Sequence, residues 1–313
     1  MKKLLFLDTN IYLNFYRVRN ESGLSLLRKL EEISDRVIVT SQVEMEFKKN
    51  RHAALTETMQ ELTNITKNLK NVKPEPGLLA ENQSMTALQQ NVKLVRKNIQ
   101  ELQSQLQQVL TNPAQSDPVY KTAEKVLTKH DELSLKRGNE QHSRIARRAM
   151  RRFFMGYPPR KKSDTAIGDA LNWEWIIEVA GKKNADIVLV SNDSDYGCRV
   201  NAESYMNDWL IEEFKERTSP QREVVLYSKL SDALSELSVR VTKQELSEEE
   251  AMLSRGYGRI SAGASSNALF ALEDLMQELY NSLQNRGPGS FGREIWHEDG
   301  SVTSFNVTKY TYQ

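Results

Sequence analysis

The chain has 313 residues, with 43 Lys and Arg against 42 Asp and Glu, so its total charge says nothing about partners and only its distribution can. This length suits one elaborated domain or two modest ones. The lone cysteine, Cys198, excludes an intrachain disulfide and, alone, a thiolate metal site, which suits a reducing cytoplasm. The N-terminal apolar run stops at Asp8, too early for a signal peptide, and no run approaches the roughly 20 apolar residues that span a bilayer. We therefore expect a soluble, cytoplasmic protein.

Four short apolar runs predict buried β-strands, at residues 4–7, 37–39, 187–190 and 224–227. Each run is nearly continuous rather than alternating, which indicates burial on both faces of a sheet. Apolar residues at helical spacing follow the first and third runs: Leu24, Leu27, Leu30 and Ile33, and then Tyr205, Trp209, Leu210 and Phe214. Strands that alternate with helices predict an α/β fold, with a parallel, doubly wound sheet of about four to five strands and flanking helices.

Residues 57–143 differ in composition from the rest of the chain and predict a helical insertion. Gln and Asn are frequent and aromatic residues are rare, while the prolines and glycine within 71–77 break the stretch in two. The two halves predict a long helical hairpin, inserted into an α/β domain made of 1–56 and 144–242; disorder is the alternative. Residues 243–313 predict a C-terminal extension, with a helix around 267–283 and a β-hairpin that turns at 297–300.

Basic residues concentrate between 121 and 162, where thirteen Lys and Arg face four Asp and Glu. On a helix, five of them would form one broad basic face: Arg144, Arg147, Arg148, Arg151 and Arg152. Together with Lys161 and Lys162, this face predicts salt-dependent contacts with nucleic-acid phosphates. The neighbouring Phe153, Phe154 and Tyr157 could stack on unpaired bases. The alternative is that the arginines are solvated or pair with the acidic segment 245–250, and that the aromatic side chains lie in the core.

Three aspartates follow predicted strands at the points where the strands end. Asp8 ends the first strand, and Asp193 and Asp195 come just after the third. Ligands of open parallel sheets bind at the carboxyl ends of the strands, so these side chains are predicted to face one crevice. The alternative is that each aspartate is an ordinary turn residue.

The helix after the second strand carries two glutamates with different expectations. The sequence from Ser41 to Glu44 matches a capping box, which gives Glu44 a structural role. Glu46 has no such role and lies on the helix that leaves the same edge of the sheet. The alternative for Glu46 is a solvated helical side chain.

A later helix brings Asp169 into the same region. Asp169 shares a helix face with Trp173 and Ile177, two residues expected in the core. Its carboxylate is thereby drawn towards the interior, where it needs a partner or a metal ion. Asp164 precedes this helix and is either its N-cap or a further ligand.

A cluster of carboxylates predicts a site for hard divalent cations. Gathered carboxylates repel one another, and Mg²⁺ or Mn²⁺ resolves the repulsion with oxygen ligands. One or two such ions can activate a water molecule and stabilise charge on a phosphoryl oxygen. The sequence offers no His/Cys cluster for zinc and no glycine-rich nucleotide-binding loop.

Four acidic segments, in chain order, resemble the motifs of PIN-domain nucleases. The segments are Leu5-Phe-Leu-Asp-Thr-Asn10, Val39-Thr-Ser-Gln-Val-Glu-Met-Glu-Phe47, Ile167-Gly-Asp-Ala-Leu-Asn-Trp173 and Leu189-Val-Ser-Asn-Asp-Ser-Asp195. The chain is most similar to a bacterial PIN-like subfamily with a Pro-Pro-x-Lys-Lys stretch before its Gly-Asp-Ala, here Tyr157-Pro-Pro-Arg-Lys-Lys162. The resemblance covers residues 1–56 and 145–235. Each motif alone is weak, whereas four in order are fairly specific.

The resemblance implies a metal-dependent endonuclease that usually acts on RNA with Mg²⁺ or Mn²⁺. It implies catalytic and metal-binding roles for Asp8, Glu46, Asp169 and Asp193, with Asp195 as a further metal ligand. Asn10, Asp164 and Ser191 are the expected auxiliary residues. The insertion and the C-terminal extension depart from compact PIN domains, so substrate choice and partners do not follow from the resemblance.

We therefore predict a hydrolase that cuts RNA, or else DNA, with metal-activated water, as a toxin, an RNA-processing enzyme or a defence effector. One alternative is a non-catalytic PIN-like scaffold that binds RNA or protein. Another is a different Mg²⁺-dependent phosphoryl hydrolase, such as a phosphatase; Asn10 stands where that chemistry usually needs a second aspartate. The insertion and the extension are the predicted surfaces for a second copy or a partner protein.

Overall fold

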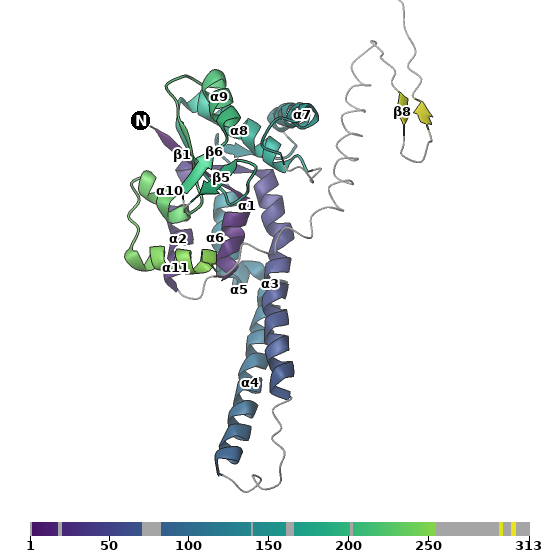
Figure 1. Cartoon of the computed structure of the whole chain (residues 1–313), viewed down its shortest axis with the longest axis vertical. Coiled ribbons are helices and arrows are strands. Elements are labelled where there is room, and N and C mark those ends of the chain that lie inside the picture. The colour runs from purple at the N-terminus through teal and green to yellow at the C-terminus, as the bar shows by residue number, and fades with distance from the viewer. Residues whose placement is uncertain are drawn as a thin grey trace, which may run out of the picture. The chain divides into compact units, whose positions relative to one another are not determined.

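The structure is a computed structural model that describes residues 2–17, 21–70, 83–138, 140–160, 166–200, 203–254, 294–296 and 302–304. The chain divides into two units, residues 1–262 and 263–313, and each is described by itself. The first unit holds the parallel sheet and all the helices named below (Figure 1).

A five-stranded, all-parallel sheet forms the centre of the first unit, in the order β3-β2-β1-β4-β7. Its strands are β1 (Lys3–Leu7), β2 (Val37–Thr40), β3 (Ser134–Leu135), β4 (Asp186–Val190) and β7 (Val224–Tyr227). The four strands predicted from apolar runs are confirmed, and β3 is the fifth. The residues of β2 and β4 are buried throughout because helices cover both faces of a parallel sheet.

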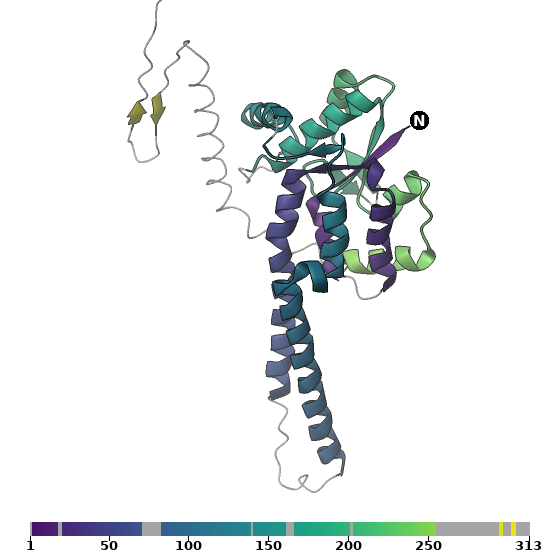
Figure 2. The same ribbon diagram turned by 180° about the vertical axis from the view of Figure 1, so that it is seen from behind.

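Helices connect the parallel strands and cover the sheet. They are α1 (Thr9–Asn14), α2 (Glu21–Glu32), α3 (Ser41–Lys70), α4 (Gln83–Thr111), α5 (Pro113–Ser116), α6 (Pro118–Leu127), α7 (Glu140–Met155), α8 (Gly168–Lys183), α9 (Asp208–Arg217), α10 (Leu230–Glu236) and α11 (Lys243–Ser254), with short 3₁₀ turns at Phe15–Arg17 and Ser34–Arg36. In two opposite views, α8 lies on one side of the sheet and α6 on the other (Figures 1 and 2). The fold is therefore the predicted α/β arrangement with flanking helices. None of the described helices is long and apolar enough to cross a membrane.

A small antiparallel ribbon precedes α9. It pairs β5 (Gly197–Val200) with β6 (Glu203–Met206). Gly197 is required here, because a Cβ atom at this position would lie only 2.0 Å from the carbonyl oxygen of Tyr205. Tyr205, which the apolar spacing placed on a helix, instead lies in β6, and α9 begins three residues later. The helical prediction for Tyr205 is therefore wrong.

The predicted helical hairpin is formed by α3 and α4, which lie side by side (Figures 1 and 2). α3 begins directly after β2 and continues without a break to residue 70, so the predicted boundary at residue 56 lies inside this helix. α6 and β3 also fall within residues 57–143, yet Val126, Leu127 and Leu135 are buried in the α/β core. The domain boundaries therefore stay a proposal, with the hairpin proper formed by the distal part of α3 and by α4.

A buried ion pair fixes the base of this hairpin. The Arg51 guanidinium on α3 donates from Nε to Asp117 Oδ2 at 2.8 Å, and both side chains are at most 2% exposed. Asp117 also caps α6 by accepting from the Tyr120 amide at 2.9 Å, and it accepts from the Tyr16 hydroxyl at 2.7 Å. Arg51 further donates to the carbonyl of Val109 near the end of α4. The clamp therefore joins α3, α4, α6 and the turn after α1.

The second unit contains a β-hairpin. β8 (Glu294–Trp296) pairs antiparallel with β9 (Val302–Ser304), as the sequence pattern predicts. The expected turn at 297–300 and the expected helix around 267–283 lie outside the described residues.

We expect Arg51→Ala to lower the free energy of unfolding by on the order of 3–5 kcal/mol, because it leaves the Asp117 carboxylate buried without its cation. Urea denaturation followed by circular dichroism measures this change. The matched control is Lys97→Ala, which breaks an exposed pair with Glu101 on α4 at 3.8 Å and should have no measurable effect. Equal stability of the two variants would contradict the clamp.

Candidate functional site

Asp8 and Asp193 meet at the carboxyl edge of the sheet. β1 and β4 are neighbouring parallel strands, and the Asp8 amide donates to the Val190 carbonyl at 2.9 Å. The Ser191 hydroxyl connects the two acids: its Oγ donates to Asp8 Oδ2 at 2.6 Å and accepts from the Asp193 amide at 3.1 Å. The strand ends therefore bring together two acids that are 185 positions apart in the sequence.

The Asp8 carboxylate is held from three sides. Asp8 is the N-cap of α1, and its Oδ1 accepts from the Thr9 amide at 2.6 Å. Its Oδ2 accepts from Asn10 Nδ2 at 2.8 Å as well as from Ser191. Asp8 is thus a helix N-cap rather than an ordinary turn residue.

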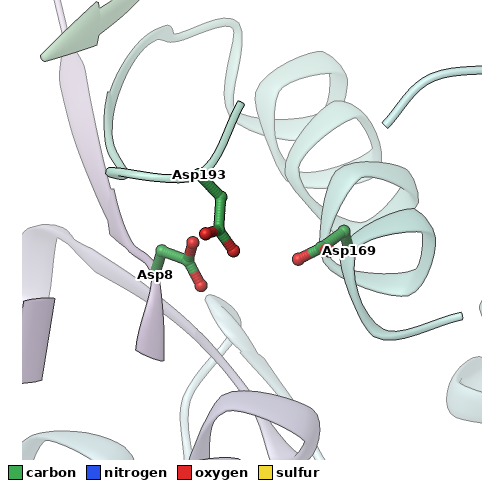
Figure 3. A group of neighbouring side chains, drawn as sticks. All are labelled: Asp8, Asp169 and Asp193. Carbon is green, nitrogen blue, oxygen red and sulfur yellow. The ribbon is translucent and has the colours of Figure 1, made fainter. Parts of the chain in front are cut away.

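Asp169 completes a group of three aspartates (Figure 3). It lies in the first turn of α8, on the same face as Trp173 and Ile177, which are 0% and 3% exposed, as predicted. Carboxylate oxygens of Asp8, Asp169 and Asp193 all lie within 4.8 Å of one another. Asp8 is buried and the other two are half-buried, so the group is open to solvent on one side.

Glu46 lies beside this group rather than in it. Its Oε2 accepts from the Thr9 hydroxyl at 2.8 Å, and its Oε1 accepts from Gln42 Nε2 at 2.6 Å. Gly168 allows the start of α8 to approach this pair, since a Cβ atom there would lie 2.7 Å from Glu46 Oε1 and 2.8 Å from Gln42 Nε2. The glycine before Asp169 therefore brings α3 and α8 close together.

The capping box predicted at the start of α3 is wrong by one residue. The cap is Thr40, whose hydroxyl accepts from the Val43 amide at 3.1 Å. Glu44 does not reach back to the helix start; its carboxylate binds Lys48 at 2.8 Å and Lys136 at 3.5 Å. Glu44 is still excluded from the carboxylate group, because two lysines neutralise it elsewhere.

Burial and neighbouring charge raise the pKa of Asp8 to about 7. The largest cause is desolvation, and the Asp193 carboxylate adds to it, followed by Glu46. Hydrogen bonds from Ser191 and Thr9 act in the opposite direction because they favour the charged form. Asp8 and Asp193 are therefore held close together against their mutual repulsion.

Sequence reasoning missed three neighbours of the site. Thr9 and Gln42 hold Glu46, and the fully buried Tyr196 feels the charges of all four acids, which helps to hold its pKa well above the ordinary value. Gln42 could have been found from its position one turn before Glu46 on α3. Nothing in the local sequence of Tyr196 distinguishes it from an ordinary core residue.

The other predicted site residues are placed as follows. Asn10 and Ser191 both contact Asp8 directly. Asp195 is buried, 7% exposed, but it is not part of the three-aspartate group, so its metal-binding role stays a prediction. Asp164, Lys161 and Lys162 lie outside the described residues.

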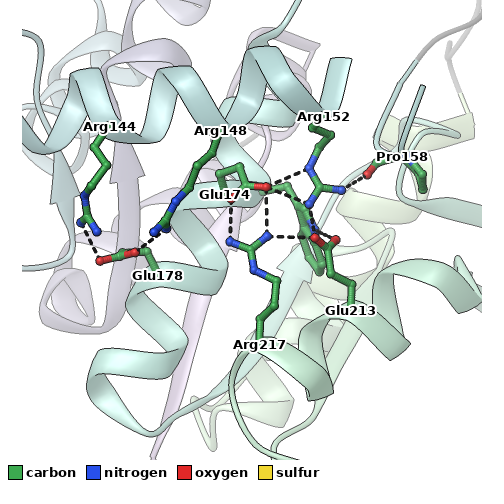
Figure 4. A network of polar contacts seen from close by, with 9 residues as sticks. Arg144, Arg148, Arg152, Pro158, Glu174, Glu178, Glu213 and Arg217 are labelled. Carbon is green, nitrogen blue, oxygen red and sulfur yellow. Dashed lines mark hydrogen bonds and ion pairs between the residues drawn. The ribbon is translucent and has the colours of Figure 1, made fainter. Parts of the chain in front are cut away.

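Two of the five predicted arginines pair with Glu178 on α8 and remain accessible (Figure 4). Arg144 and Arg148 donate to its two oxygens at 2.7 and 2.9 Å, and their side chains are 41% and 43% exposed. Partial burial alone would raise the pKa of Glu178, but Arg144 and Lys182 outweigh it and hold this pKa down to about 2. Arg147 and Arg151 are exposed on the same helix.

The prediction that Arg152 belongs to the exposed basic face is wrong, because this side chain is buried. It is 4% exposed, and its guanidinium binds Glu174 at 2.8 Å together with Glu213 and the carbonyl of Pro158 (Figure 4). Arg217 binds the same two glutamates, at 2.7 and 2.9 Å. Arg152 therefore holds α7, α8 and α9 together and cannot contact phosphates from solvent. Arg144, Arg148 and Arg152 therefore pair with acids of α8 and α9 rather than with segment 245–250.

The donor set of the aspartate group suits a hard divalent cation. All three side chains offer carboxylate oxygens, and among the described residues no histidine or cysteine joins them. Mg²⁺ and Mn²⁺ take such ligands and retain water molecules in their remaining positions. The residues present therefore fit the cation that the sequence predicted.

A family model described as "PIN like domain" matches residues 4–224, more than half of the chain. The chain belongs to this PIN-like family. The match contains all four acidic segments and the α3–α4 hairpin. Searches of curated proteins and of solved structures gave no significant match.

We expect the affinity for Mn²⁺ to fall as the pH drops below about 7, because binding must displace the proton that Asp8 takes up there. For one proton, the fall is about tenfold per pH unit. In the metal-free protein, the stability of the fold changes with pH in the opposite direction. Between the unfolded and the folded pKa of Asp8, the folded state holds a proton that the unfolded state has lost. The free energy of unfolding therefore decreases as the pH rises through this window.

Titration calorimetry between pH 5.5 and 8, and melting curves with and without Mn²⁺, measure both effects. The increase in melting temperature on adding Mn²⁺ should grow with pH, and Asp8→Asn should remove most of this dependence. A metal effect that is constant over the range would contradict a metal ligand with a raised pKa at Asp8.

Proposed function

We propose that this chain is a metal-dependent endonuclease, and most specifically a ribonuclease that hydrolyses phosphodiester bonds. The observation that carries the proposal is the convergence of Asp8, Asp169 and Asp193 within 4.8 Å in a member of the PIN-like family. In this proposal, the three aspartates hold one or two Mg²⁺ or Mn²⁺ ions. A bound ion supplies an activated water molecule and stabilises charge on the phosphoryl oxygen.

The neighbouring residues would position the ligands before substrate arrives. Ser191 and Asn10 fix the rotation of the Asp8 carboxylate through hydrogen bonds of 2.6 and 2.8 Å. Thr9 and Gln42 each occupy one oxygen of Glu46, so this carboxylate is oriented rather than mobile. We propose that Glu46 acts beside the cation ligands, as the acceptor of a proton from the attacking water. Asp195 is proposed as an auxiliary acid.

Two alternatives from the sequence are less well supported. In a phosphatase with an aspartyl nucleophile, a second acid would stand two residues after Asp8; instead Asn10 donates its amide to Asp8. A non-catalytic scaffold would not need a glycine that admits Glu46 to the start of α8, nor a buried Asp8 whose pKa is raised by desolvation and by the nearby Asp193 and Glu46 carboxylates. Both features favour a working site.

We propose that the exposed arginines of α7 contact the phosphates of the substrate. Arg147 and Arg151 are exposed, and Arg144 and Arg148 keep over a third of each side chain accessible while paired with Glu178. Lys161 and Lys162 remain predicted contacts on the sequence alone. RNA in preference to DNA rests on the family resemblance.

The cellular context is also a proposal. A cytoplasmic location, and a role as a toxin, an RNA-processing enzyme or a defence effector, stay predictions from the sequence. Association with a second copy or a partner protein is proposed through the hairpin or the C-terminal extension. Exposed apolar side chains along α4, with Leu88, Leu94 and Leu102 each more than 40% exposed, favour the hairpin.

We expect Asp8→Asn and Asp193→Asn each to lower metal-dependent cleavage of single-stranded RNA by a factor on the order of a hundred or more, since each removes a charged ligand of the cation. Purified protein with Mn²⁺, Mg²⁺ or EDTA, and with RNA or DNA, gives the measurement on denaturing gels. Asp35→Asn is the control, an exposed aspartate at the opposite end of β2. Wild-type rates in the two site variants would overturn the assignment.

We expect the double substitution Arg147→Ala and Arg151→Ala to weaken RNA binding and to flatten its dependence on salt, by about 0.7 in the slope per lost phosphate contact. Fluorescence anisotropy at several salt concentrations measures the slope. Arg240→Ala removes an exposed arginine outside α7 and serves as the control. If the double variant keeps the wild-type slope, α7 does not contact the phosphates.

A further inference from the structure

The exposed face of α7 changes from basic to aromatic along its length. Arg147, Arg148 and Arg151 are exposed, and Phe154 and Met155 follow Arg151 at helical spacing on the same face. Phe154 is 65% exposed, although burial of a ring this size is strongly favourable. This face therefore combines cations with a flat apolar ring in solvent.

A stacked pair of aromatic rings includes Tyr157, which follows α7 by two residues. The rings of Tyr157 and Trp209 lie with centroids 5.4 Å apart and an interplanar angle of 29°. They come from the turn after α7 and from the start of α9, yet 41% and 48% of the two residues stay exposed. Two distant segments thus place aromatic rings together without burying them.

The backbone holds both rings in place before any ligand binds. Gly156, with φ of +75°, ends α7 in the left-handed conformation, and the Tyr157 amide donates to the Arg152 carbonyl at 3.1 Å. Asn207 caps α9 by accepting from the Trp209 amide at 3.0 Å. A ligand that stacks here therefore loses little free energy in ordering the protein.

A short series of contacts joins this ring pair to the carboxylate group. Trp209 and Glu213 lie one turn apart on α9, and Glu213 accepts from Trp173 Nε1 at 2.9 Å. Trp173 in turn lies one turn after Asp169 on α8. The rings and the aspartates are therefore fixed relative to one another by two helices in direct contact.

We propose that Phe154, Tyr157 and Trp209 form a stacking platform for unpaired nucleobases of the substrate strand. This inference rests on the proposed nuclease function and adds a binding subsite to it. The platform is chemically complementary to a single-stranded nucleic acid. Its flat rings suit the bases, and the adjacent arginines of α7 suit the phosphates. Bases within a duplex hide their faces, so the platform selects single-stranded segments.

The test measures binding separately from cleavage. The full-length Asp8→Asn protein in EDTA is titrated into fluorescein-labelled oligonucleotides: a single-stranded RNA 12-mer, its duplex, and an abasic strand of equal charge. We expect Tyr157→Ala and Trp209→Ala, added singly to this background, to weaken binding of the single strand about tenfold or more. Tyr157→Phe and Trp209→Phe keep a ring and should retain most of the affinity. Val225→Ala, at an exposed apolar residue on β7, is the control.

Tryptophan fluorescence gives a second readout. Of the four tryptophans, Trp173 and Trp175 are at most 1% exposed, and Trp296→Phe is added to every protein used for this readout. Stacking of a base should therefore quench mainly Trp209, which is 48% exposed. The single strand should quench it, and the duplex and the abasic strand should not. Trp209→Phe should remove the quenching while keeping most of the binding.

The outcomes separate the platform from the proposed function. The platform is wrong if the single strand and the abasic strand bind the Asp8→Asn protein equally, if neither alanine variant loses affinity, or if no strand binds. A surface for a partner protein would give this result. If wild-type protein with Mn²⁺ still cleaves RNA in that case, the nuclease function stands. If the single strand binds through the platform but no metal supports cleavage, the nuclease function is wrong and the platform stands.

Discussion

The mutual repulsion of three aspartates held within 4.8 Å is the constraint on which this structure depends. A buried carboxylate beside two others loses hydration and gains unfavourable charge, as the raised pKa of Asp8 records. Its neighbours act against this cost, with Ser191, Asn10 and the Thr9 amide donating to one carboxylate. A divalent cation would stabilise such a site strongly, because its charge offsets the repulsion and the carboxylate oxygens become its ligands.

Two buried polar networks hold the helices that carry these acids. On one side of the site, the Arg51–Asp117 pair fixes α3 to α6 within two turns of Glu46. On the other, Arg152 and Arg217 share Glu174 and Glu213 and so join α7, α8 and α9 around Asp169 (Figure 4). Hydrogen bonds are directional, whereas apolar contacts are not. These networks therefore fix the orientation of the helices as well as the distance between them.

Much of the fold and the carboxylate group could be predicted, because both follow from local patterns. Continuous apolar runs predict the long strands, and parallel strands bring Asp8 and Asp193 to one edge whatever the length between them. β3 was missed because two residues carry no periodicity, and the capping box failed because Thr40 and Ser41 are both competent caps. The burial of Arg152 could not be predicted from the sequence, because its partners Glu174 and Glu213 come from other helices. The spacing of the arginines along α7 does not distinguish Arg152 from the other four.

The unbroken course of α3 has a consequence for how this fold can change in evolution. Glu46 and residue 70 lie on one stiff rod, about 36 Å apart along its axis, and the Arg51 clamp grips the rod just beyond the site. The parts of α3 and α4 beyond this clamp can lengthen or shorten together by whole helical repeats. Such a change keeps the contacts between the two helices in register and leaves the Arg51–Asp117 pair unaltered. The geometry thus separates the carboxylate site from an arm whose length can change without rebuilding that site.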